Sequence, residues 1–115
     1  MTRIKDIETA LLKFEEAAVK HAEATENGDY KTGNKNYAVI AKVVVFLKEY
    51  DSIEKLTSFL NHKSVGVRMW AARYLLPVVE VEALRILKQI ASGTGIHSFT
   101  AKTTVSEWEK GNLKL

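Results

Sequence analysis

Residues 60–76 read LNHKSVGVRMWAARYLL, and this stretch decides the class of fold. Its apolar residues recur at steps of three and four: Val67, Trp70, Ala71, Tyr74 and Leu75. That spacing places them on one face of a helix. Ser64 is a residue type that caps a helix at its start, and Pro77 ends the helix because a proline disfavours helical backbone at the residue before it. We therefore expect a helix over residues 65–76.

The segments on either side of this stretch have the same helical periodicity. We expect further helices at about residues 2–25, 30–47, 53–60 and 79–91. After a loop at residues 92–95, a last helix should contain Phe99 and Trp108 and end at Gly111. Tyr30 and Tyr37 continue the apolar stripe of the second helix in chain order, and Phe99 continues that of the last. The valines at 43–45 would also suit a strand, but the pattern around them is helical and no other segment could pair with them.

Short polar connections separate these helices. Asn27 or Gly28 can take the left-handed conformation that ends a helix, and Asp29 can accept hydrogen bonds from the free amides of the next one. Six helices joined in this way form either a closed bundle or an open stack of helix pairs. Residues 56–72 echo residues 87–101 at an offset of about 30, which is typical of repeats and favours the stack. The predicted fold is all-α, with one domain over residues 1–115 built of stacked antiparallel helix pairs in a short α–α superhelix.

Residues 60–72 resemble the signature of a HEAT repeat. In that signature a Val-Arg pair, here Val67 and Arg68, opens a helix, and small residues, here Ala71 and Ala72, follow one turn later. Small side chains let neighbouring helices approach closely, and the arginine can reach carbonyls or a carboxylate of an adjoining repeat. HEAT repeats often have an acidic residue where His62 stands in this chain. Arg68 therefore needs another partner, and the candidates include Asp51 and Glu80.

A longer run, residues 60–108, is similar to a small bacterial family known as domain of unknown function two thousand and nineteen. The features that carry this likeness are Val67-Arg68-x-Trp70-Ala71-Ala72, a following Ala-x-x-x-Leu helix, a glycine loop and a closing helix that runs from Ala to Trp. The likeness extends weakly over the N-terminal helix pair. It implies a fold and brings no established activity.

The composition is that of an ordinary globular domain of 115 residues, 46% hydrophobic and 27% charged. The absence of cysteine excludes disulfides and thiolate catalysis. Charged residues interrupt the N-terminal sequence, and the longest apolar cluster, residues 43–47, is far shorter than the about 20 residues of a membrane-spanning helix. We therefore expect a cytoplasmic protein that does not enter a membrane.

No group of residues in the sequence has the pattern of a catalytic, cofactor or metal site. The histidines, His21, His62 and His97, stand in different segments and form none of the pairs that direct two nitrogens at one zinc ion. The adjacent carboxylates at 15–16 and at 80 and 82 point apart on a helix, so they would not converge on a substrate. The sequence predicts no enzyme, no cofactor and no metal ion.

Two features are candidates for binding a partner. Lys31, Lys35 and Lys42 fall on one face of a helix, close to Tyr30, and could contact phosphates, although exposed lysines are usually only solvated. Trp108 either covers the last helix pair or contacts a partner, whereas Trp70 lies on an apolar stripe and is expected in the core. The net charge of +3 is too small for a dedicated nucleic-acid binder.

These observations favour a protein-binding module without catalytic activity, because helical repeats generally hold other proteins on a concave surface. An immunity or inhibitor protein that covers the active site of a toxin is one function of this kind. The alternative is a HEAT-like protein that binds nucleic acid through the basic face of residues 31–42. An enzyme with a small-molecule substrate ranks third.

Overall fold

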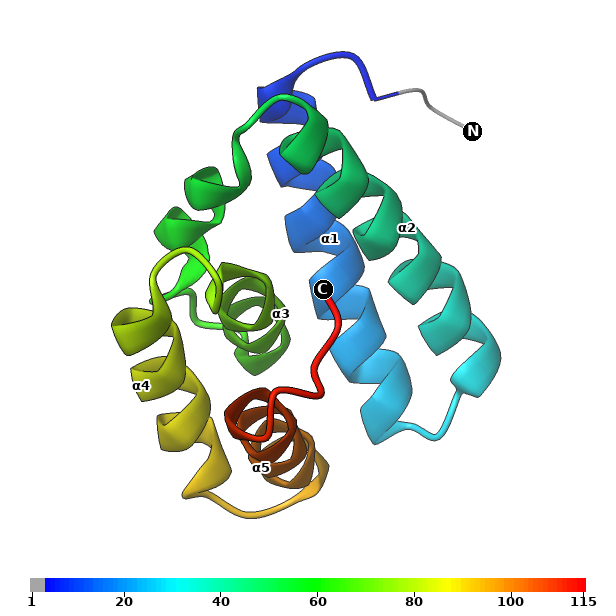
Figure 1. The fold of residues 1–115 in the computed structure, drawn as a ribbon. Helices are drawn as coiled ribbons and strands as arrows, with labels where there is room; N and C mark the ends of the chain where they lie inside the picture. Colours follow the sequence, from blue (N-terminus) through cyan, green and yellow to red (C-terminus); the bar gives the residue numbers. More distant parts are fainter. Residues whose placement is uncertain (1–3) are drawn as a thin grey trace. The chain divides into compact units, whose positions relative to one another are not determined.

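The computed structural model describes residues 4–115, and every regular element in that range is a helix. The elements are α1 (Ile7–Glu26), α2 (Tyr30–Glu49), the 3-10 helix η1 (Ile53–Phe59), α3 (Val65–Leu75), α4 (Glu80–Ala91) and α5 (Ile96–Glu109) (Figure 1). The prediction of an all-α fold with about six helices is confirmed. The chain divides into two compact units, Met1–Lys55 and Leu56–Leu115, and each is described by itself.

The first unit is a hairpin of two long helices, α1 and α2, which pack along each other. α1 begins at Ile7 because the Asp6 carboxylate accepts a hydrogen bond of 2.7 Å from the amide of Thr9. The predicted start at Thr2 falls outside the described residues, and Ile4 and Lys5 precede the helix, so that prediction was too early. A capping carboxylate, rather than the apolar period, determines where the helix begins.

The connection between α1 and α2 behaves as the sequence predicts. Gly28 has a φ of 71°, and the Gly28 amide donates to Thr25 O while the next amide donates to Ala24 O. This Schellman motif ends α1. The Asp29 side chain then accepts from the Thr32 amide at 3.2 Å and starts α2. Three residues outside either helix, 27–29, are therefore enough to turn the chain.

The inner face of α2 follows a different register from the predicted one. Its buried residues are Gly33, Asn36, Ile40, Val43, Val44 and Leu47. Tyr37 lies one residue beside this stripe and is 46% exposed, and Tyr30, the first residue of the helix, is 72% exposed. The expectation that these tyrosines continue the apolar stripe was wrong. The helical prediction for residues 43–45 is confirmed, because burying two of three consecutive valines is compatible with a helix.

Asp51, two residues after the end of α2, has a φ of 53° without being glycine. The Asp51 amide donates to Lys48 O, and the Ser52 amide donates to Leu47 O at 2.8 Å, so this is again a Schellman motif. The short helix that follows, η1, is of the 3-10 type, with the Lys55 amide donating to Ser52 O.

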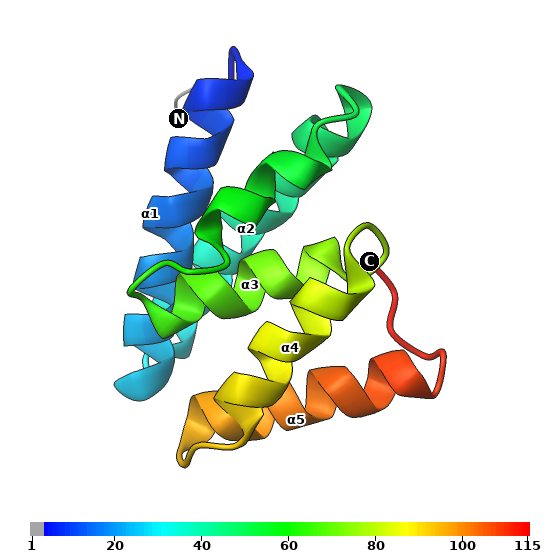
Figure 2. The same ribbon diagram turned by 90° about the vertical axis from the view of Figure 1, so that its left-hand side faces the viewer.

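In the second unit, α3 packs against α4 and α4 packs against α5 (Figure 2). α3 covers residues 65–75, as predicted to within one residue, and Ser64 accepts from the Val67 amide at its start. Val67, Ala71 and Ala72 are fully buried, as expected for small residues at a close helix contact. Trp70 is only half-buried, so its placement in the core was only partly right. Its ring is stacked on Tyr74, with centroids 6.1 Å apart.

Arg68 is held by backbone carbonyls. Its Nη1 donates to His62 O at 2.8 Å and to Lys63 O at 3.1 Å, so the arginine secures the connection that precedes its own helix. Of the two kinds of partner considered for Arg68, backbone carbonyls and a carboxylate, the structure shows the carbonyls. The candidate carboxylate of Glu80 instead accepts a hydrogen bond from Trp108.

α5 begins at Ile96, directly after the predicted glycine loop, but its inward-facing residues differ in part from the predicted ones. Ser98, Ala101, Thr104 and Val105 are buried, whereas Phe99 is 71% exposed. The expectation that Phe99 lies on the inner stripe was wrong, because Ser98 occupies the inward position beside it. Across residues 4–115, none of the helices combines the length and apolar content needed to cross a bilayer.

Candidate binding site between α4 and α5

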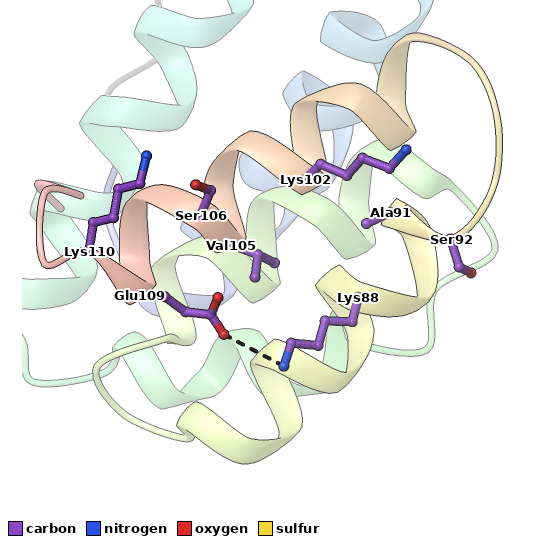
Figure 3. Close-up of a pocket in the computed structure, with 8 residues that line it drawn as sticks. All are labelled: Lys88, Ala91, Ser92, Lys102, Val105, Ser106, Glu109 and Lys110. Carbon is purple, nitrogen blue, oxygen red and sulfur yellow. Dashed lines mark ion pairs between the residues drawn. The ribbon is translucent and has the colours of Figure 1, made fainter.

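In the second unit, a hollow of about 520 Å³ lies between the end of α4 and the face of α5. We call it the α4–α5 groove (Figure 3). Its lining residues are Lys88, Ala91, Ser92, Lys102, Val105, Ser106, Glu109 and Lys110. It is an open groove with an apolar floor and a charged rim, since Val105 and Ala91 lie at its base and lysines stand around it.

Helical geometry brings these residues together. Positions 102, 105, 106, 109 and 110 recur at steps of three and four, so they share one face of α5. On α4, residues 88, 91 and 92 belong to the last turn and its cap. The groove therefore exists only because the two helices pack side by side.

Polar contacts fix α4 and α5 against each other at both ends. At one end the buried Ser98 hydroxyl donates to Ile90 O at 2.8 Å. At the other end the Trp108 indole donates to the Glu80 carboxylate at 2.7 Å, although the two residues are 28 apart in the chain. An ion pair of 3.7 Å between Lys88 and Glu109 crosses the groove itself (Figure 3). These contacts hold the groove in a defined shape.

The charge of the groove is positive. Lys88 is paired with Glu109, whereas the structure of residues 4–115 gives Lys102 and Lys110 no carboxylate within ion-pairing distance. The second unit as a whole has eight Lys and Arg against four Asp and Glu, a net charge of +4. The first unit has nine against ten, a net charge of −1. The groove thus lies in the unit that attracts anionic groups.

The predicted basic strip, Lys31, Lys35 and Lys42, lies in the other unit. All three lysines are exposed on α2, on one face as predicted. The hollow described near them, at the turn between α1 and α2, is lined by Tyr30 and Asn34 and also by the acidic Asp29. None of these three lysines lines that hollow.

Trp108 lies beside the α4–α5 groove without lining it. The side chain is half-buried and its Nε1 hydrogen is used by Glu80, so it holds the end of α5 to the start of α4. The hydrogen bond fits the covering role considered for Trp108, and its role in binding a partner stays a prediction. The motif residues Val67, Ala71 and Ala72 are buried in α3 and cannot contact a partner directly.

Sequence reasoning did not find Lys88, Lys102 and Lys110 as a group, because they come from two helices. One signal was present in the sequence: residues 56–115 carry the excess of basic side chains. The sequence analysis also did not single out Arg73. Its Nε is buried without a hydrogen-bond partner, and it lines a smaller hollow of about 240 Å³ with Phe99 and Glu107.

The part of the chain that the structure describes contains no group of three or more His, Asp or Glu side chains that could hold a metal ion. Neither a family model nor a curated protein matches the chain. The resemblance to HEAT repeats and to domain of unknown function two thousand and nineteen therefore stays a prediction.

Among solved structures, the chain is similar to the crystal structure of the protein RPA1889 from Rhodopseudomonas palustris CGA009, with a TM-score of 0.87. The match covers 98% of this chain and 99% of that one, at 21% sequence identity. At this level of identity the likeness shows a shared all-helical fold.

Proposed function

We propose that this chain is a protein-binding module without catalytic activity, and that the α4–α5 groove is where it holds its partner. The observation that carries the proposal is the groove itself, in which lysines surround an apolar floor of the buried Val105 and the half-buried Ala91. Protein interfaces combine an apolar centre with a polar rim, whereas small-molecule sites are usually enclosed. Exposed apolar residues on the same two helices, Val81 of α4 at 81% and Phe99 of α5 at 71%, also suit a protein contact.

The HEAT-like assignment belongs to the same proposal. Two observations support it: Ala71 and Ala72 are fully buried in α3, and Arg68 binds the carbonyls before its helix. A cytoplasmic helical module of this kind would suit an immunity or inhibitor protein, which covers the active site of a toxin. A partner bound over the groove would bury the exposed lysines against acidic groups.

A photo-crosslinking residue placed in the groove tests the proposal. Ser106 is replaced by p-benzoylphenylalanine in the native cell, and Ala38, which is exposed on α2, is replaced in a control. We expect a defined protein adduct from position 106 and none from position 38. Failure to recover an adduct above background from position 106 would remove the proposal.

Nucleic-acid binding is the second candidate, and one observation favours it. Lys31, Lys35 and Lys42 are all exposed on one face of α2, next to the exposed Tyr30 ring. Such binding would weaken steeply with salt, because each neutralised phosphate releases counterions. A gel shift at low salt with single-stranded and duplex DNA and RNA tests this function. If no nucleic acid is retarded, nucleic-acid binding is eliminated. If Lys31→Glu/Lys35→Glu abolishes the retardation, the binding site lies on this face of α2.

A further inference from the structure

The outer face of α5 and the outer face of α1 have complementary charge patterns. On α5, Lys102, Ser106 and Lys110 are spaced at i, i+4 and i+8 along the rim of the α4–α5 groove. On α1, Glu8, Leu12 and Glu16 have the same spacing. A helix rises about 1.5 Å per residue, so in both patterns the outer charges are about 12 Å apart.

The α1 face is exposed and carries an apolar centre. Glu8 and Glu16 are exposed, and Leu12 between them is 63% exposed. In the opposing pattern the central residue is the small Ser106, which lines the hollow beside Val105. A leucine side chain can therefore enter the groove where the two lysines flank a gap. Both patterns are symmetric, so either relative direction of the two helices brings the charges into register.

We propose that the α4–α5 groove binds α1 of a second copy of this chain, with Glu8 and Glu16 at Lys102 and Lys110 and Leu12 over Val105. The inference rests on the proposed function, because it names the partner of the same groove. The charges of the two units, −1 and +4, favour contact between the first unit of one molecule and the second unit of another.

The groove fits a protein carboxylate pair better than a nucleic acid. Its lining contains no arginine and no aromatic ring, which are the usual residues for bidentate phosphate contacts and for base stacking. Lys102 and Lys110 are also too far apart, at about 12 Å along the helix, to hold one phosphate together.

The contact is heterologous, because the two surfaces that meet are different. Each molecule keeps one free groove and one free α1, so association continues beyond a dimer as concentration rises unless the rotation closes a ring. Exposed ion pairs are weak and screened by salt. Glu16 also pairs with Lys20 on α1 at 3.6 Å, and that exposed pair competes with the intermolecular one. The association is therefore weak and salt-sensitive.

Charge reversal with sedimentation velocity tests the inference on the purified chain. We expect the average mass of the unaltered protein to rise with concentration up to about millimolar at low salt and to stay monomeric at high salt. Lys102→Glu/Lys110→Glu and Glu8→Lys/Glu16→Lys should each abolish association alone, because like charges then meet. An equimolar mixture of the two variants should restore it, since each groove again finds an α1 of opposite charge.

The mixture also controls for misfolding. Its two components are the same variants that fail to associate alone, and misfolded variants would not associate when mixed. Lys31→Glu/Lys35→Glu, which makes the same change of charge on α2, is the matched control and should change the association constant by less than about twofold. Leu12→Ser should weaken association about tenfold, and Val45→Ser, at another exposed apolar position, should not.

Three results would overturn the inference: a monomer at every concentration, a mixture that fails to associate, or an equal loss of association in the α2 control. Crosslinking from position 106 separates these outcomes from failure of the proposed function. An adduct with residues 8–16 of a second copy supports the inference. If position 106 crosslinks to a different protein and the purified chain stays monomeric, the proposed binding module stands and self-association is rejected. No adduct of any kind rejects both.

Discussion

The two units of this protein are stabilised in different ways. In the first unit, two helices of 20 residues each begin at capping aspartates and pack through an alanine-rich face. In the second, α4 and α5 have 12 and 14 residues and lack a side-chain cap at their starts. Tertiary contacts such as Ser98 with Ile90 O and Trp108 with Glu80 act there instead.

The two units also differ in their capacity to bind a partner. The unit that relies on local helix signals is nearly neutral, whereas the unit that relies on tertiary contacts carries the positive charge and the α4–α5 groove. A groove between two helices needs those helices held at a fixed spacing. Hydrogen bonds at both ends of the α4–α5 pair provide it.

The largest effect is expected from Leu87→Ala in α4. Leu87 is fully buried, and its replacement should cost about 2–5 kcal/mol of unfolding free energy through lost burial and the cavity left behind. The exposed Leu12→Ala in α1 should cost well under about 1 kcal/mol. Urea unfolding of the two variants checks this. A similar loss in both would contradict the assignment of Leu87 to the core.

A smaller loss is expected from adding volume at α3. Ala71 is fully buried, so Ala71→Leu should overpack the helix contact and cost about 1–3 kcal/mol. Ala38→Leu, which adds the same atoms at an exposed position of α2, should leave stability almost unchanged. Thermal unfolding followed by circular dichroism measures both. An unchanged midpoint for Ala71→Leu would mean that α3 is loosely packed.

Ser98→Ala should separate the contribution of a buried tertiary hydrogen bond from that of a local one. Removing the hydroxyl that donates to Ile90 O should cost about 1 kcal/mol, because the carbonyl then loses a partner inside the protein. Thr103→Ala removes an exposed hydroxyl that donates to Phe99 O one turn earlier, and should cost less. Equal losses would mean that the buried tertiary hydrogen bond between α5 and α4 stabilises the second unit no more than a local one does.

The smallest effect concerns the caps of the first unit and depends on pH. Hydrogen bonds from Thr9 lower the pKa of Asp6, and those from Thr32 lower the pKa of Asp29, both from an ordinary value of 3.8. A lowered pKa means that the folded state favours the ionised caps. Their contribution to stability is therefore complete above 3.8 and is lost as pH falls through the lower folded values. Asp6→Asn/Asp29→Asn should flatten this part of a stability–pH curve.

The sequence predicted the helices well because their boundaries are local signals. Gly28 and Pro77 mark chain turns whatever the tertiary structure is, and Ser64 caps α3 as expected. Which face of a helix turns inward was less predictable. Phe99 and Tyr37 are large and apolar, but Ser98 and Asn36 take the buried positions beside them. A buried polar residue gives no sign of its burial in a hydrophobicity pattern.

The candidate site was not predictable for a related reason. Lys31, Lys35 and Lys42 were noticed because they share one predicted helix. Lys88 joins Lys102 and Lys110 only through the packing of α4 on α5, which the sequence does not specify. The spacing of Lys102, Ser106 and Lys110 was visible in the sequence, but the hollow that makes these residues a candidate binding site was not.

The positions of the two tryptophans, Trp70 and Trp108, provide an internal optical report on folding. Both lie in the second unit, so intrinsic indole emission follows the unfolding of residues 56–115 alone, whereas far-ultraviolet ellipticity follows helices of both units. If the two signals change at the same denaturant concentration, the halves unfold as one cooperative body. If emission changes at a different concentration, the hairpin of residues 1–55 melts separately.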